Sequence, residues 1–280
     1  MSRSDHGRAR RLFAAFAHDL QVGVRSNILN YLVAAAVFAL LCDQARRTGD
    51  VSLPDQTPAW IDYALHALNG VPTPAADHDG LVLPITWLLP QVLLALLVAS
   101  YPAKGLSGYS VHTLHCVGSR TDWWVAKWLW LVFTVLTFYA VAALVWLVFS
   151  LVFDGMTAAP RPDVGAVING LDMSQVTTAE AYGLLAVPVL LSLAMSTVQM
   201  VLALTLRPML AFLLVVSYLA VSSLSRSKLL VGDFAMVARN GAFDTQGVKT
   251  APMCAILAAV ILVTIGVGLW SFNRRDLLPQ

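Results

Sequence analysis

Charged residues are absent from six long stretches of the chain, and these stretches are strongly apolar. An α-helix needs about 20 apolar residues to cross a hydrocarbon core roughly 30 Å thick. Four of the stretches exceed that length and the other two, of 17 and 18 residues, lie just below it. We therefore expect an all-α membrane protein with one transmembrane domain over 1–280. Its six transmembrane helices are predicted at about 26–42, 81–103, 127–153, 181–206, 208–225 and 250–273.

The residues before the first stretch have the pattern of an amphipathic helix. Phe13, Phe16, Leu20 and Val24 recur at helical spacing on one face, whereas basic residues cluster at the start of the segment. Such a helix lies in the membrane interface with its apolar face toward the acyl chains. We expect an N-terminal elbow helix over 8–25 that turns upward into the first transmembrane helix.

Basic residues are distributed unequally between the two sides of this topology. The side that holds both termini receives 11 of the 18 Lys and Arg residues. Because loops rich in Lys and Arg stay in the cytoplasm, we expect both termini to be cytoplasmic. Charged residues make up only 12% of the chain, about half the content of an ordinary soluble domain. A soluble enzyme is therefore an unlikely class for this sequence, and a multi-pass protein of the plasma membrane is expected.

The connections on the opposite side differ in character. Residues 58–69 are rich in aromatic and aliphatic side chains and favour one short interfacial helix. Residues 154–180 contain Pro and Gly and predict no clear element. Residues 226–249 alternate apolar pairs with charges, which suits either a segment that dips into the interface or a solvated loop.

A few uncharged polar residues lie within the transmembrane stretches, among them Gln91, Tyr139 and Ser192. They either line a cavity or hydrogen-bond between helices, which is the commoner use of such residues. The absence of charge in the same stretches argues against a proton relay or an ion pump built on buried carboxylates. Pro90 and Pro188 predict kinks in their helices.

Sequence motifs for nucleotide binding, for a nucleophilic serine and for a metalloprotease are absent. His112, His115 and Cys116 lie close together, but no second cluster completes a tetrahedral metal site. We therefore expect no metal, no cofactor and no catalytic residue in this chain, and no nucleic-acid partner. Cys42 and Cys254 both fall near the outer face in this topology, where a disulfide between them is geometrically conceivable.

Four short segments, in order along the chain, carry a family resemblance. They read GSRTDWWVAK at 118–127, LRP at 206–208, FAMVAR at 234–239 and NRRDL at 273–277. Their order and spacing resemble the membrane subunits of ABC-2 type ATP-binding-cassette exporters. Six helices, an amphipathic N-terminal helix and cytoplasmic termini extend this resemblance over essentially the whole chain.

The resemblance implies a permease subunit that has no nucleotide-binding site of its own and works with a separate cytoplasmic ATPase, which binds ATP and Mg. Two permease subunits, identical or related, would assemble in the membrane among its lipids. The loop at 104–119 would act as the coupling element that contacts the ATPase. The residues implied in that contact are Leu106, Tyr109, His112, Leu114, His115 and Arg120.

The resemblance also places the second and fifth helices at the central interface, so Gln91, Ser217 and Tyr218 are candidates to face the substrate. Arg120 and Lys127 would orient the exit of the coupling loop, either by binding anionic lipid or simply as part of the basic cytoplasmic side. The leading interpretation is a bacterial exporter of an amphipathic peptide, drug or lipid-like substrate.

Two other classes of function compete with this interpretation. The acidic first outer loop motivates a non-transporting membrane protein that sequesters a ligand or regulates a sensor kinase. A membrane-embedded enzyme is the least favoured class, because the transmembrane stretches lack charged catalytic groups.

Overall fold

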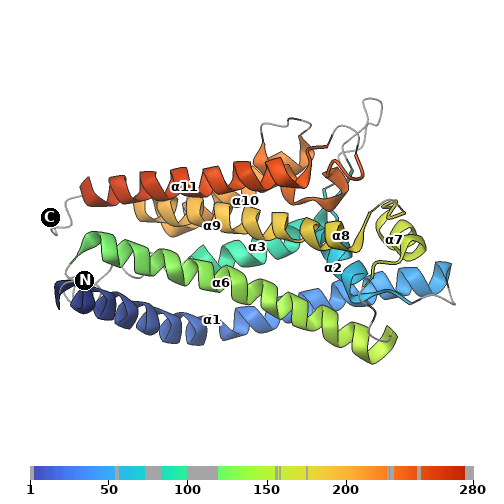
Figure 1. Cartoon of the computed structure of the whole chain (residues 1–280), viewed down its shortest axis with the longest axis horizontal. Coiled ribbons are helices and arrows are strands. Elements are labelled where there is room, and N and C mark those ends of the chain that lie inside the picture. The colour runs from blue at the N-terminus through green and yellow to red at the C-terminus, as the bar shows by residue number, and fades with distance from the viewer. Residues whose placement is uncertain are drawn as a thin grey trace.

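The computed structural model consists of helices joined by short connections (Figure 1). The residues that it describes are 3–53, 57–72, 83–99, 119–154, 157, 159–174, 176–225, 227, 230–244 and 247–274. Within them, strand-like pairing is limited to one isolated β-bridge between Asn240 and Val248. The prediction of an all-α protein is confirmed for these residues.

The helices are long in the body of the molecule and short at one end of it (Figure 1). In chain order they are α1 (Arg3–Ser52), α2 (Trp60–Leu68), α3 (Ile85–Ala99), α6 (Arg120–Phe149), the π-helical turn η1 (Ser150–Asp154), α7 (Pro162–Asn169), α8 (Thr178–Leu184), α9 (Ala186–Thr205), α10 (Pro208–Leu224), the 3-10 turns η2 (Val231–Ala235) and η3 (Val237–Arg239), and α11 (Thr250–Arg274). We call the end where α1 and α6 begin and α11 ends the terminal end. The opposite end, with α2, α7 and α8, is the distal end.

Four helical segments are long and apolar enough to cross a membrane. They are Phe16–Ser52, Arg120–Asp154, Thr178–Thr205 and Thr250–Arg274. The helices α3 and α10 are apolar but shorter, with 15 and 17 residues. Each predicted transmembrane stretch thus contains a helix, although the prediction for 81–103 extends beyond the described residues on both sides of α3. Four long apolar helices are compatible with a membrane protein.

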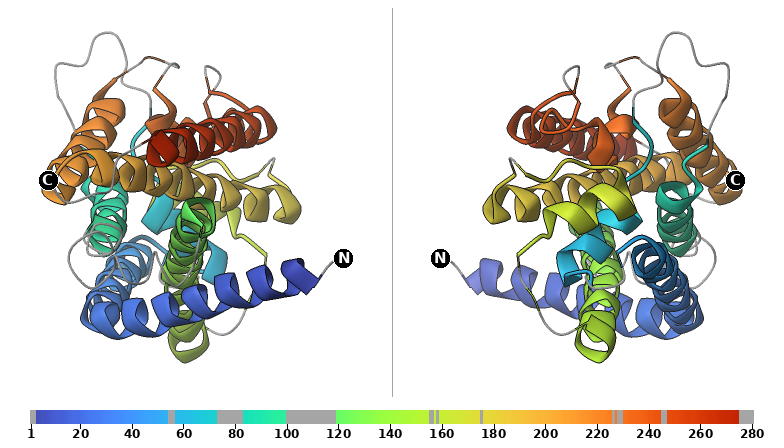
Figure 2. Two further views of the ribbon diagram at one scale, coloured as in Figure 1. Left: turned by 90° about the vertical axis from the view of Figure 1, so that its left-hand side faces the viewer. Right: turned by 90° about the vertical axis from the view of Figure 1, so that its right-hand side faces the viewer.

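The predicted elbow helix and first transmembrane helix form one continuous element, α1, of 50 residues. Its first part crosses the terminal end of the molecule obliquely, and the rest runs along the long axis (Figure 2). Ser26 lies within α1, and its hydroxyl donates to the carbonyl of Gly23 at 3.1 Å. A serine bonded back to the preceding turn bends a helix without ending it. The elbow is therefore a bend in α1, with no separate turn.

The structure also extends α1 ten residues past the predicted boundary at 42. Two ion pairs support the extension, each between residues one turn apart on the helix. Arg47 pairs with Asp43 at 2.8 Å, and Arg46 pairs with Asp50 at 3.9 Å. Such pairs stabilise a helix in water by a few tenths of a kcal/mol each. The apolar stretch ends at Cys42. Hydropathy alone therefore does not predict a helix that continues through the charged residues that follow.

The distal connections are more ordered than their sequences predict. The short helix predicted within 58–69 is present as α2, but its apolar residues are buried in the core and do not face an interface. The prediction of no element in 154–180 is wrong, because α7 and α8 form there. Residues 231–240 are buried, so they are neither an interfacial segment nor a solvated loop.

Pro188 has a larger effect than the predicted kink. A proline has no N–H to donate to the carbonyl four residues earlier, and its ring clashes with that carbonyl, which here belongs to Leu184. The helix is interrupted at Leu185, whose N–H instead bonds the carbonyl of Tyr182 at 3.2 Å. The stretch predicted as one helix is therefore divided into α8 and α9.

The core has two parts that follow the arrangement of the helices. In the first, α1 and α6 pack side by side, and Phe38 makes edge-to-face contacts with Phe138 and Trp146 at 5.4 and 5.7 Å between ring centroids. In the second, α3, α9, α10 and α11 surround Phe234 and Met236 of the buried distal segment. We call α1 and α6 the first helix group, and α3, α9, α10 and α11 the second helix group.

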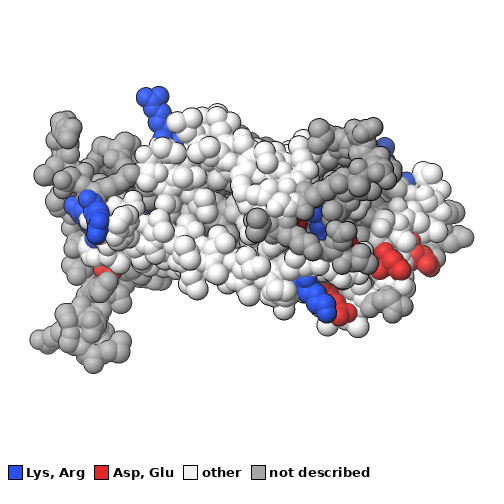
Figure 3. All heavy atoms as spheres, turned by 90° about the horizontal axis from the view of Figure 1, so that it is seen from above, with Lys and Arg blue, Asp and Glu red and all other residues white. Residues whose placement is uncertain are grey.

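Charged side chains gather at the two ends of the molecule. On the face drawn in Figure 3, the middle of the surface carries neither Lys and Arg nor Asp and Glu among the residues shown, whereas both ends do. Many large apolar side chains are exposed on the long helices, including Leu144 of α6 and Leu262 of α11, which are 60% and 69% exposed. This uncharged belt is the surface that a lipid bilayer would cover.

Candidate functional site

Three helices meet at the terminal end, directly after the predicted coupling loop. They are the first part of α1, the start of α6 and the last turn of α11 (Figure 1). Ser119, the last residue of the predicted loop, precedes α6 in extended conformation. The contacts among the three helices define the candidate site.

A buried ion pair joins α1 to α6 at this site. Lys127 Nζ lies 2.7 Å from Asp19 Oδ1, and the two side chains are only 10% and 7% exposed. The ammonium group also lies 5.5 Å from the ring centroid of Trp123, a cation–π geometry. Lys127 therefore faces protein groups, whereas the sequence offered anionic lipid as one of its uses.

A second set of contacts joins α6 to α11. Arg120 Nη1 donates to the main-chain carbonyl of Asn273 at 3.2 Å, which satisfies an acceptor in the last turn of α11. Trp123 stacks on Phe272, with ring centroids 4.9 Å apart and an interplanar angle of 12°. Arg120, predicted as part of the coupling surface, thus links the start of α6 to the end of α11.

Two glycines allow the close approach of helices at this end. A Cβ added at Gly23 of α1 would overlap Nε1 of Trp130, and a Cβ at Gly268 of α11 would lie 2.7 Å from the Trp124 ring. Both tryptophans belong to α6 and are buried. These two tryptophans therefore form part of the packing surface for α1 and α11.

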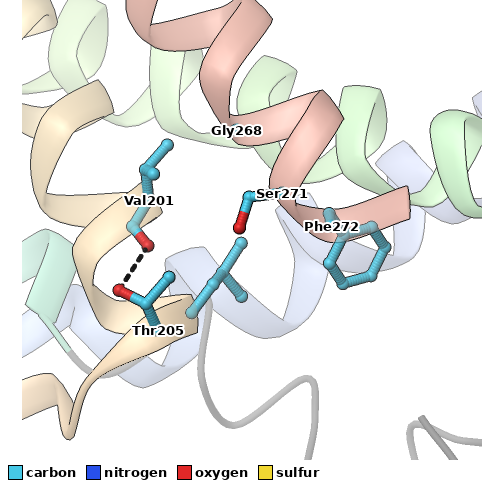
Figure 4. A pocket seen from close by; sticks show the side chains of 6 residues that line it. Val201, Thr205, Gly268, Ser271 and Phe272 are labelled. Carbon is cyan, nitrogen blue, oxygen red and sulfur yellow. Dashed lines mark hydrogen bonds between the residues drawn. The ribbon is translucent and has the colours of Figure 1, made fainter. Parts of the chain in front are cut away.

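The recess between α9 and α11 at the terminal end is too small to bind a substrate. Val201, Thr205, Gly268, Ser271 and Phe272 line it, and Thr205 is turned back to hydrogen-bond the carbonyl of Val201 at 3.3 Å (Figure 4). Its volume is about 10 Å³. A space of this size holds about one water molecule.

The polar residues predicted within the transmembrane stretches hydrogen-bond between helices. Ser192 donates to Gln91 Oε1 at 2.9 Å, and the Tyr139 and Ser192 hydroxyls are 2.8 Å apart. Gln91 Nε2 lies 3.4 Å from the Tyr139 hydroxyl, which in turn lies 3.2 Å from the carbonyl of Pro188. This network connects α3, α6 and α9. Gln91 is buried within it at 4% exposure.

The other predicted substrate-path residues lie on α10. Ser217 is exposed and Tyr218 is half-buried. Their role in a substrate path stays a prediction. The remaining predicted coupling residues lie outside the described residues, namely Leu106, Tyr109, His112, Leu114 and His115.

Buried charged side chains at the distal end also make polar contacts. Asp154 is placed by the π-helical turn η1, accepts a hydrogen bond from Tyr63, and has Arg46 Nε at 3.8 Å. Asp62 of α2 is fully buried and accepts from the Ala59 N–H at 2.8 Å. Burial raises the pKa of Asp62 to about 6, while backbone hydrogen bonds from Ala59 and Arg161 and the Arg161 charge oppose that rise.

The buried segment 231–240 is fixed by Arg239, which is 5% exposed. Its guanidinium donates to the carbonyls of Val71, Ser223 and Ser225 at 3.1, 2.6 and 3.1 Å and pairs with Asp233 at 2.8 Å. Burial raises the pKa of Asp233, whereas the Ser222 hydroxyl and Arg239 lower it. Arg239 thereby caps the last carbonyls of α10 and closes the distal side of the second helix group.

Some of these contacts were not foreseen from the sequence. No local pattern assigns a role to Asp19, because its partner Lys127 lies 108 positions away. The available signal was a lone acid on a basic segment and a lone Lys at the start of an apolar stretch. Cys42 and Cys254 are free thiols, so the conceivable disulfide is not formed. Among the described residues no group of His, Cys, Asp and Glu is arranged to hold a metal ion.

Comparisons with known proteins give one match. The family described as "Protein of unknown function (DUF2705)" matches residues 61–278. No curated protein and no solved structure matches the chain. The family match begins in α2 and continues past the end of α11, so it includes the start of α6 and the last turn of α11, which are two of the three parts of the candidate site. Since the match extends over most of its length, the chain belongs to this family.

Proposed function

We propose that the chain is the membrane-spanning permease subunit of an ATP-driven exporter and that it works with a separate cytoplasmic ATPase. The observation that carries the proposal is the meeting of three helices directly after the predicted coupling loop. Asp19 and Lys127 tie α1 to α6, and Arg120 and Asn273 tie α6 to α11. A force applied just before Ser119 would therefore act on all three helices.

In this proposal six helices cross the plasma membrane of a bacterial cell and the terminal end is cytoplasmic. Four long apolar helices support the proposal, and α3 and α10 are the two shorter ones. The excess of Lys and Arg in the segments at the terminal end supports the orientation. The uncharged belt between the two ends supports the embedding in lipid (Figure 3).

The coupling step consists of a change of contacts. ATP and Mg belong to the partner ATPase, whose closure would displace the loop at 104–119. This chain's residues would transmit the displacement, since Lys127 pulls on α1 through Asp19 and Arg120 pulls on α11 through the carbonyl of Asn273. A partner shifts such an equilibrium only by contacts that differ between its two states.

The substrate path would lie against a second permease subunit, identical or related. The exposed side of α10 supports this position, since Ser217 lies there among large exposed apolar residues such as Leu214 and Val221. Tyr218 is next to it, and Gln91 becomes accessible only if α3 moves relative to α9. A wall of this composition suits an amphipathic substrate such as a peptide, drug or lipid-like molecule.

Co-purification tests the proposal. The tagged chain is expressed with its genomic neighbours and purified in detergent, and a nucleotide-binding protein is expected to co-elute. Substitution of Tyr109→Asp and Leu114→Asp in the coupling loop should abolish co-elution. As a matched control, Val51→Asp and Leu83→Asp place two acids on exposed apolar positions toward the distal end, where 86% and 40% exposure tolerates them, and should leave co-elution unchanged.

A chain that elutes alone, with no ATPase encoded nearby, contradicts the exporter proposal. That result would favour the non-transporting protein that sequesters a ligand or regulates a sensor kinase. Equal loss of co-elution in the coupling-loop variant and in the control would also contradict the assigned coupling surface.

A further inference from the structure

A large open cavity lies at the distal end, apart from the coupling site and the buried polar network. It separates α8 from the start of α11 and has a volume of about 580 Å³. Cavities that bind small molecules measure about 300–1,000 Å³. The residues used in the following argument are Val176, Glu180, Leu184, Asn240, Lys249 and Thr250.

The cavity carries opposite charges on its two walls. Glu180 lies in the first turn of α8, and Lys249 directly precedes α11. Both residues are exposed, and neither forms an ion pair with a described residue. The carboxylate of Glu180 is held in place because its Oε2 accepts from the Thr177 N–H at 2.9 Å and the Thr177 hydroxyl at 2.8 Å. Its other oxygen has no partner among the described residues.

The floor of the cavity is formed by buried side chains with fixed positions. Leu184 is buried beneath it, at 3% exposure. Asn240 is 4% exposed; its amide donates to Thr250 Oγ1 at 3.1 Å and its carbonyl accepts from the Ala242 N–H at 3.1 Å. The floor therefore needs no rearrangement to receive a ligand, which lowers the entropic cost of binding.

We propose that this cavity is a binding site for a small zwitterionic molecule with an apolar body, of the class of short peptides. The ammonium end would face Glu180, the carboxylate end would face Lys249, and the apolar body would cover the half-buried side chain of Val176. The site lies on the side of the molecule opposite to the ATPase contacts. It is a property of the chain alone and goes beyond the proposed exporter function.

Gly183 provides a variant that fills the cavity without disturbing the fold. It lines the cavity, lies within α8, and has no heavy atom within 4 Å of an added Cβ. Gly266 of α11 is equally open but lies on an exposed helix face away from the cavity. Gly183→Phe should block binding, and Gly266→Phe is its matched control.

The experiment measures binding of trileucine to the detergent-purified full chain by isothermal titration calorimetry. Removal of one charge, in N-acetyl-trileucine or in trileucine amide, should weaken binding about two- to fivefold, the usual effect of an exposed ion pair. Gly183→Phe should weaken trileucine binding by at least about tenfold, and Gly266→Phe should leave it unchanged. Lys249→Glu should weaken trileucine binding but strengthen binding of the amide.

Three outcomes overturn the proposal. One is the absence of trileucine binding at millimolar concentration. Another is equal binding of the three peptides to the parent and to Gly183→Phe, which indicates partition into detergent. The third is loss of trileucine binding in phosphatidylethanolamine nanodiscs but not in phosphatidylglycerol nanodiscs, which assigns the cavity to a lipid headgroup. None of these readouts depends on an ATPase.

Discussion

At the scale of single residues, several buried charged side chains in the described parts of the molecule link one element to another. Asp19 and Lys127 link α1 to α6 at the terminal end. At the distal end, Asp154 accepts a hydrogen bond from Tyr63 and pairs with Arg46. Arg239 donates to three main-chain carbonyls and pairs with Asp233. Removal of one member of such a pair leaves an uncompensated charge, which costs more than the pair itself contributes.

Lys127→Ala should therefore lower the free energy of unfolding by about 3–5 kcal/mol, because the Asp19 carboxylate stays buried without its ammonium partner. The double variant Asp19→Leu with Lys127→Leu should recover most of that loss. Thermal unfolding of the purified protein in detergent measures both. The exposed pair Arg47 and Asp43 is the control, since Arg47→Ala should cost no more than about 0.5 kcal/mol. Equal effects at the two pairs would contradict the burial argument.

Stability should also depend on pH through Asp62. Its pKa is about 6 in the folded protein against an ordinary value of 3.8, so the folded state holds the proton more tightly than the unfolded chain. The stabilising contribution is complete below the ordinary pKa and is lost as pH rises through about 6. Asp62→Asn stays neutral at all pH values and keeps an acceptor for the Ala59 N–H.

Comparison of thermal unfolding at about pH 5 and about pH 8 tests this expectation. Asp62→Asn should reduce the difference in unfolding free energy between the two pH values by about 1.4 kcal/mol. Asp172 is exposed, and hydrogen bonds from Ser174 lower its pKa, so Asp172→Asn should leave the difference unchanged over this range. A difference that persists in Asp62→Asn would show that another group is responsible.

At the scale of elements, the approach of α1 to α6 depends on a missing side chain. Gly23→Ala places a methyl group against Trp130 and should destabilise the protein by about 1–3 kcal/mol. Gly183→Ala, in open space within α8, should instead stabilise it by about 0.5–1 kcal/mol, because Ala restricts the unfolded chain. Thermal unfolding distinguishes the signs. Stabilisation by both substitutions would contradict the close packing described for Gly23.

The long apolar helices could be predicted from local sequence, whereas one short helix and the buried distal segment were not. All six apolar stretches contain helices because the apolar runs are long and uninterrupted. Helix α7 was missed although its signals are local, with Pro162 at its first position and Gly170 in the left-handed conformation at its end. Burial of 231–240 was beyond sequence reasoning, since it depends on Arg239 reaching carbonyls from residues as far away as Val71.

The candidate site was predictable in the same limited sense. Arg120 and Lys127 were recognised from their position after the coupling loop, whereas the Asp19 partner required the bend that brings the start of α1 across the terminal end (Figure 2). No local pattern encodes that direction, because the helix itself continues unbroken through the bend.

At the scale of the whole molecule, the proposed orientation can be tested by cysteine labelling in cells. In a variant with Cys42, Cys116 and Cys254 replaced by Ala, Val51→Cys marks the distal end and Asn273→Cys the terminal end, both at exposed positions. A membrane-impermeant maleimide should label position 51 in intact cells and position 273 only after permeabilisation. Labelling of both positions in intact cells would contradict the transmembrane arrangement.

Two ion pairs that link α1 to residues 120–154 have a mechanical consequence. Asp19 of α1 pairs with Lys127 near the start of α6, and Arg46 of α1 pairs with Asp154 directly after α6. The two helices are therefore linked by an ion pair near each end. Sliding of α1 along α6 would break both ion pairs and also separate Phe38 from Phe138 and Trp146. We therefore expect α1 and α6 to move together as one rigid body. We expect a hinge between these two helices and the group formed by α3, α9, α10 and α11. The contacts that would break there are the hydrogen bond between Tyr139 and Ser192, the hydrogen bond from Arg120 to Asn273 and the stacking of Trp123 on Phe272.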